Sequence, residues 1–156
     1  MRDTIEAEVA PIVEGMGFSL VELKLGLSHK QARVTVVVYR PQNLGIDDIA
    51  KLSRVIRPRL DLIEGLENVT LVVTSPGVDR VIKSRQEFAI FKGRGTRILV
   101  EGEADWHCGV IEDADEKTVV LETKNGTEAL DIDRIKKARL DYTQEDPIVY
   151  ANGNGD

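Results

Sequence analysis

A break in the hydrophobic pattern at Ser75-Pro76-Gly77 limits the folds open to this chain more than any other feature. Before the break, runs with helical spacing alternate with runs of strand spacing, whereas after it nearly every apolar run has the two-residue period of a short strand. Proline presets a tight turn and glycine permits positive φ, so the chain leaves the preceding strand on a defined path. We therefore predict two domains within the 156 residues, joined near this turn.

The first part of the chain has the pattern of an α+β sandwich. Two segments with helical spacing and three with strand alternation follow one another at 5–16, 18–25, 33–39, 46–63 and 68–74. The order helix, strand, strand, helix, strand predicts a three-stranded sheet with two helices on one face. We expect this N-terminal domain to span residues 1–80.

The second part is typical of a small β-barrel. After a short helical segment at 86–92, five segments alternate as strands do: 96–101, 108–112, 118–123, 127–132 and 138–142. Asn125-Gly126 is a strong signal for a hairpin turn between two of them. Because closing the sheet removes exposed edges, we predict a barrel over 81–143, followed by a flexible tail over 144–156.

Charge is distributed unevenly along the chain. Residues 1–100 contain 15 Lys and Arg and 12 Asp and Glu, whereas residues 101–156 contain 6 and 15, and the whole chain has a net charge of −6. Between positions 78 and 97 only two residues are acidic and six are basic: Arg80, Lys83, Arg85, Lys92, Arg94 and Arg97. A cationic connector in an acidic protein indicates contact with phosphate, and an acidic C-terminal third suits a basic protein partner, although acidic residues also keep a small β domain soluble.

Few residues of the chain could support catalysis. The single cysteine, Cys108, excludes an internal disulfide and a thiolate zinc cluster, and in a strand the adjacent His107 points to the opposite face. Ser75 lacks the glycine-flanked elbow of serine hydrolases. A small hydrolase that uses Ser75 or Cys108 is an alternative that we disfavour, and we expect no enzyme activity, no cofactor and no metal.

The chain also has no pattern typical of membrane insertion. No apolar run approaches the ~20 residues of a membrane span, and the N-terminal residues turn acidic before a signal-peptide core could form. We therefore expect a cytoplasmic protein without a membrane partner.

Several motifs, taken in combination, are specific to one known family. The element Val73-Thr74-Ser75-Pro76-Gly77-Val78-Asp79-Arg80 follows a predicted strand and precedes Phe-Ala-Ile-Phe-Lys-Gly at 88–93. Further markers are Val-Ala-Pro-Ile-Val-Glu-Gly-Met-Gly-Phe at 9–18, Asp-Asp-Ile-Ala-Lys-Leu-Ser-Arg at 47–54 and Ile-Asp-Arg-Ile-Lys-Lys-Ala-Arg-Leu at 132–140. Over residues 5–142 the chain resembles the bacterial ribosome maturation factor P (RimP) family, although Asp-Trp-His-Cys-Gly at 105–109 is less typical of it.

The resemblance implies a non-enzymatic factor that binds the immature small (30S) ribosomal subunit and assists its late assembly. It implies an N-terminal α+β domain and a C-terminal Sm-like or SH3-like barrel. It also implies a partner within that subunit, a very basic ribosomal protein, number twelve, and the basic connector adds small-subunit rRNA as an expected second partner. The alternative is a general RNA-binding or RNA-chaperone module that acts through the barrel.

The charge pattern and the resemblance together predict three groups of site residues. We expect the six basic residues between positions 78 and 97 to contact rRNA phosphates. The turn between the domains is expected to be set by Ser75, Pro76, Gly77 and Asp79. The basic protein partner is expected to contact Asp113, Asp115, Glu116, Asp131 and Asp133. We expect the protein to be a monomer.

Overall fold

The chain forms two compact units, Met1–Pro76 and Gly77–Asp156, which we call the N-terminal and C-terminal units. The structure is a computed structural model that describes residues 1–42 and 45–145. The boundary between the units lies within the Ser75-Pro76-Gly77 turn. Gly77 is not among the glycines with positive φ, so this turn does not use the backbone freedom expected of it.

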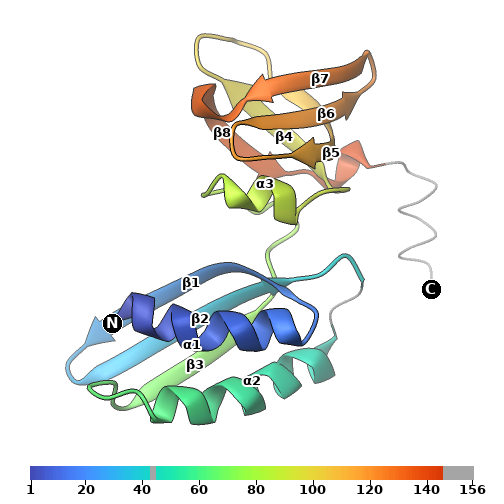
Figure 1. The fold of residues 1–156 in the computed structure, drawn as a ribbon. Helices are drawn as coiled ribbons and strands as arrows, with labels where there is room; N and C mark the ends of the chain where they lie inside the picture. The colour runs from blue at the N-terminus through green and yellow to red at the C-terminus, as the bar shows by residue number, and fades with distance from the viewer. Residues whose placement is uncertain (43–44, 146–156) are drawn as a thin grey trace. The chain divides into compact units, whose positions relative to one another are not determined.

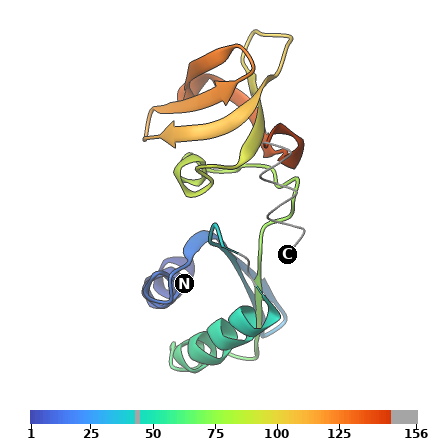
Figure 2. The same cartoon turned by 90° about the vertical axis from the view of Figure 1, so that its right-hand side faces the viewer.

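The N-terminal unit is a three-stranded sheet with two helices on one face (Figures 1 and 2). Its elements in chain order are α1 (Arg2–Gly15), β1 (Ser19–Ser28), β2 (Gln31–Tyr39), α2 (Ile46–Asp61) and β3 (Val69–Thr74). β1 and β2 form an antiparallel hairpin, and β3 is parallel to β2. Parallel neighbours need a crossover connection, which α2 supplies. The predicted order of helices and strands is confirmed.

One apolar core joins the helices and the sheet of this unit. Fully buried side chains from three elements form its centre: Ile5, Val9 and Val13 of α1, Val34, Val36 and Val38 of β2, and Leu52, Ile56 and Leu60 of α2. The helix residues are four apart and the strand residues two apart, which places each set on one face of its element. All residues of this core cluster come from the N-terminal unit.

The C-terminal unit contains a five-stranded antiparallel sheet (Figure 1). Its elements in chain order are α3 (Gln86–Ile90), β4 (Gly95–Val100), β5 (His107–Ala114), β6 (Thr118–Thr123), β7 (Gly126–Asp131), the 3-10 turn η1 (Ile132–Arg134), β8 (Ile135–Leu140) and the 3-10 turn η2 (Tyr142–Gln144). The strands lie in the order β7-β6-β5-β4-β8. The prediction of one short helix followed by five strands is confirmed.

The closed barrel predicted for this unit is not observed, because the sheet is open. β7 and β8 are its outer strands, and no strand pairing joins them within residues 77–145. The outer side of β8 is paired instead with the chain that precedes α3. The N–H of Ile82 donates to the carbonyl of Ala138, and the N–H of Leu140 donates to the carbonyl of Arg80, both at 2.8 Å.

This extra pairing, centred on Val81 and Arg139, was not expected from the sequence. It places Arg80 in the C-terminal unit, whereas the predicted N-terminal domain extended to residue 80.

The predicted flexible tail over 144–156 lies mostly outside the described residues. Its first two residues are described, and both make polar contacts. The side-chain amide of Gln144 donates to Asp141 at 3.2 Å, and a carboxylate oxygen of Glu145 accepts from the N–H of Gly95 at 3.1 Å. These two residues are therefore attached to the C-terminal unit.

Candidate nucleic-acid interface

A buried ion pair organises the segment that carries much of the connector's basic charge. The Nε of Arg80 lies 2.8 Å from Oε1 of Glu87, and the two side chains are only 9% and 1% exposed. The other oxygen of Glu87 accepts hydrogen bonds from the main-chain N–H groups of Lys83 and Ser84, at 3.1 and 3.0 Å. Arg80 is thus paired with a buried residue of the same unit, and its burial argues against the rRNA contact predicted for it.

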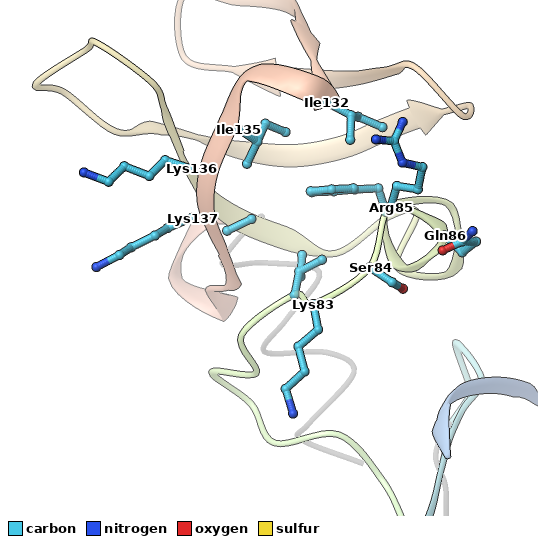
Figure 3. Close-up of a pocket in the computed structure, with 11 residues that line it drawn as sticks. Lys83, Ser84, Arg85, Gln86, Ile132, Ile135, Lys136 and Lys137 are labelled. Atoms are coloured by element: carbon cyan, nitrogen blue, oxygen red, sulfur yellow. The ribbon is translucent and has the colours of Figure 1, made fainter. Parts of the chain in front are cut away.

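Beside this segment lies an open pocket of about 510 Å³ (Figure 3). Its apolar lining consists of Ile82, Phe88, Ile132, Ile135 and Ala138. Four basic residues also line it, and we call the site the basic pocket after them: Lys83, Arg85, Lys136 and Lys137. In Figure 3 the ammonium groups of the three lysines extend away from Ile132 and Ile135. The pocket therefore combines an apolar lining with cationic groups that reach outward.

A β-bulge explains why two consecutive lysines are both exposed. The register between β4 and β8 pairs Leu99 with Lys137 and Val100 with Ile135, so Lys136 is an extra residue in β8. Neighbouring side chains of a regular strand point to opposite faces, and a bulge re-aims one of them. Neither lysine makes an ion pair with a residue in the described part of the chain.

Arg94 and Arg97, also predicted to contact phosphate, do not line the basic pocket. The Nε of Arg94 is 2.9 Å from Glu145, and the Nε of Arg97 is 3.2 Å from Asp141. These carboxylates compensate the charge of both guanidinium groups. The two arginines are consequently less suited to bind phosphate than Lys136 and Lys137, which the predicted contacts did not include.

The acidic residues predicted to bind a basic partner gather largely at one end of the sheet. The pairing of Thr118 with Asp131 brings the turn between β5 and β6 beside η1. In that turn Asp115 accepts from the N–H groups of Lys117 and Thr118, both at 2.8 Å, and these hydrogen bonds lower its pKa. Asp131 accepts from the N–H of Asp133 at 3.0 Å. Asp115 and Asp131 therefore stabilise local turns.

Of the remaining predicted contacts, Asp133 and Asp113 form ion pairs within the same unit, whereas Glu116 is contacted through its main-chain carbonyl. Arg85 lies 2.7 Å from Asp133, and it donates a second hydrogen bond to the carbonyl oxygen of Glu116 at 2.7 Å. Lys92 lies 3.9 Å from Asp113, and both side chains are largely exposed. Arg85 therefore connects the basic pocket with the acidic end of the sheet.

Two titratable residues of β5 lie outside the basic pocket. Burial raises the pKa of the Cys108 thiol, which leaves little of the nucleophilic thiolate at neutral pH. His107 has a carboxylate at each ring nitrogen, from Glu128 at 3.0 Å and Glu103 at 2.8 Å. The hydrogen bond with Glu128 raises the pKa of His107 most, and Glu103 adds to the increase.

Two other kinds of feature were sought in residues 1–42 and 45–145. No group of three or more His, Cys, Asp and Glu side chains there could hold a metal ion. None of the helices in that part of the chain has the length and apolar character needed to cross a membrane.

Known proteins are similar to both units of this chain. The family model of the RimP N-terminal domain matches residues 8–79. Two relatives, each called ribosome maturation factor RimP, come from Borrelia turicatae (strain 91E135) and Borrelia hermsii (strain HS1 / DAH). Each is 26% identical over 129 residues, which cover 83% of this chain and 88% of the relative. A match of this length extends beyond the N-terminal unit into the C-terminal one.

Proposed function

Since this chain belongs to the RimP family, we propose that it is a ribosome maturation factor that binds the immature small (30S) ribosomal subunit and assists its late assembly without catalysing a reaction. The names of its relatives support a role in ribosome maturation. Binding to the immature particle would favour productive arrangements of rRNA and protein, which requires no chemical step.

The basic pocket is the observation that carries this proposal. Lys83, Lys136 and Lys137 are exposed around one concave surface of an otherwise acidic part of the chain. Lysine binds phosphate as a point charge, and a local cluster attracts a polyanion even where the net charge is negative. We infer that the pocket contacts the phosphate backbone of small-subunit rRNA.

Neutralising two lysines of the pocket tests this role. The double variant K136Q/K137Q should bind purified immature small subunits more weakly, because two phosphate contacts are lost. The slope of log affinity against log salt should become shallower by about 0.7–0.9 for each lost contact. K117Q/K124Q is the matched control, because it removes two exposed lysines from the same unit outside the pocket. An unchanged slope, or an equal change in the control, would contradict the phosphate role.

A binding titration with unstructured RNA, set beside the titration with immature subunits, distinguishes the alternative function. A general RNA-binding module should bind unstructured RNA as tightly as it binds the immature subunit, whereas an assembly factor should prefer the subunit.

If the protein acts without catalysis, cells carrying Ser75→Ala or Cys108→Ala should show normal small-subunit profiles on gradients.

We further infer that the protein partner is the basic small-subunit ribosomal protein number twelve, which the acidic C-terminal unit would attract. The order of one short helix and five strands supports an Sm-like classification of this unit, although its sheet is open in the described residues. We expect the protein to act in the cytoplasm, as a monomer.

A further inference from the structure

The loop between β4 and β5, residues 101–106, exposes a tryptophan among carboxylates. Trp106 is the only tryptophan of the chain, and 39% of its surface is exposed. The loop carries three exposed acidic residues and no basic one; the acidic residues are Glu101, Glu103 and Asp105. Tryptophan is enriched in protein interfaces, because a large apolar ring gains much from being covered.

Arg97 indicates which chemistry this ring can bind. Its guanidinium carbon lies 5.8 Å from the centroid of the Trp106 ring, within the range of a cation–π interaction. Asp141 forms an ion pair with the same guanidinium, so Arg97 does not cancel the charge of the loop. The indole already accepts one cation from its own chain and remains partly exposed.

His107, the residue that follows Trp106 in the chain, holds two carboxylates. Its ring nitrogens contact Glu103 and Glu128, and the imidazole is 21% exposed. Even when fully protonated, His107 contributes one positive charge against two carboxylates, so the surroundings stay acidic. Carboxylates held in place lose less conformational entropy when they bind a cation.

The acidic end of the sheet is a weaker candidate for the same partner. There Asp115 and Asp131 accept hydrogen bonds from turn N–H groups, and Asp133 pairs with Arg85. A phosphate backbone would be repelled by residues 101–106, whereas arginine and lysine side chains complement both the ring and its carboxylates.

We propose that Trp106, Glu103 and Asp105 form the docking surface for an arginine- or lysine-rich segment of the protein partner. This inference rests on the proposed function only for the class of partner. It places the contact on residues outside the acidic set predicted from the sequence.

The single tryptophan makes the surface directly observable. We would titrate the full chain with an octa-arginine peptide and follow tryptophan fluorescence, with a Gly-Ser peptide of equal length as the blank. Saturable quenching or a spectral shift is expected from octa-arginine alone. E103Q/D105N should weaken binding about three- to tenfold, because two exposed ion pairs are lost. E112Q/E116Q removes the same charge from exposed positions of the unit and should change the affinity less than twofold.

Calorimetry extends the test to the ring itself. Trp106→Ala should weaken octa-arginine binding about two- to fivefold, and Trp106→Phe should restore part of the loss. A fluorescence spectrum that octa-arginine leaves unchanged would overturn the proposal, as would equal losses in E103Q/D105N and E112Q/E116Q. These peptide measurements need no ribosomal subunit, so they can succeed or fail independently of the salt test on Lys136 and Lys137.

Discussion

His107 makes the stability of the C-terminal unit depend on pH. Its pKa in the folded chain is raised above the ordinary value of 6.5, first by the hydrogen bond with Glu128 and also by Glu103. A raised folded pKa means that the stabilisation is fully present below about pH 6.5 and is lost as the pH rises through the folded value. The stabilisation lost in this way should be less than about 1 kcal/mol, because solvent reaches His107 and its two carboxylates.

Urea unfolding of the wild type and of His107→Gln at pH 5.5 and pH 8.5 measures this effect. Taking the difference between the two proteins at each pH removes the contribution of other titrating groups. The wild type should have its larger advantage at pH 5.5, and an advantage that grows at pH 8.5 would contradict the assigned pKa direction.

At the scale of residues, the sequence predicted where charge accumulates but not how it is paired. Six basic residues between positions 78 and 97 could be counted directly, yet Arg85 pairs with Asp133, which is 48 positions further along the chain. Arg80 was predicted to be an exposed contact residue, whereas in the fold it is buried against Glu87. Such pairs depend on tertiary structure, which local composition does not contain.

At the scale of elements, Gly109 sets how closely β5 and β6 approach. A Cβ atom at this position would collide with the main-chain carbonyl oxygen of Glu122 in β6. Gly109→Ala is therefore expected to lower the free energy of unfolding by about 1–3 kcal/mol, the usual cost of overpacking.

Thermal unfolding followed by circular dichroism would measure this change. Gly15→Ala is the matched control, because nothing lies within 4 Å of a Cβ at that position. It should be neutral or slightly stabilising, since alanine favours helix more than glycine does. A Gly109→Ala protein that melts like the wild type would show that the strands can separate at no cost.

Hydrophobic periodicity predicted the elements well, because each helix and strand carries its own repeat. The extra pairing of Val81 with Arg139 was missed, since a strand this short has no repeat to recognise. The bulge at Lys136 was missed for a related reason: it is a property of the register between β4 and β8, not of either strand. The lysine pair was left out of the predicted phosphate contacts because those were taken only from positions 78–97.

At the scale of the whole molecule, the position of the boundary between the units can be tested by truncation. A fragment that begins at Gly77 keeps the ion pair between Arg80 and Glu87, whereas one that begins at Val81 leaves the Glu87 carboxylate buried without it. The shorter fragment should be less stable by about 3–5 kcal/mol, the usual cost of removing one partner of a buried pair. Urea unfolding of the two fragments gives the comparison, and equal midpoints would show that Arg80 does not belong to the C-terminal unit.

The two-part organisation followed from the change of pattern at Ser75-Pro76-Gly77, which is a local feature of the sequence. The exact boundary could not be predicted from this local feature, because the residues after the turn join the second sheet only through contacts with β8, nearly 60 positions away. Closure of a barrel could not be predicted either, since strand count alone does not determine whether the outer strands meet.

The strand order of the second sheet affects the protein's own synthesis. The N-terminal unit finds all its strand partners within one continuous stretch, so it can fold while later residues are still being translated. Within the C-terminal unit, β4 pairs on one side with β5, which is made next, and on the other with β8, the last of the five strands to be made. One edge of β4 therefore stays unpaired until β8 has left the exit tunnel, and during that interval the nascent C-terminal unit is most open to mispairing.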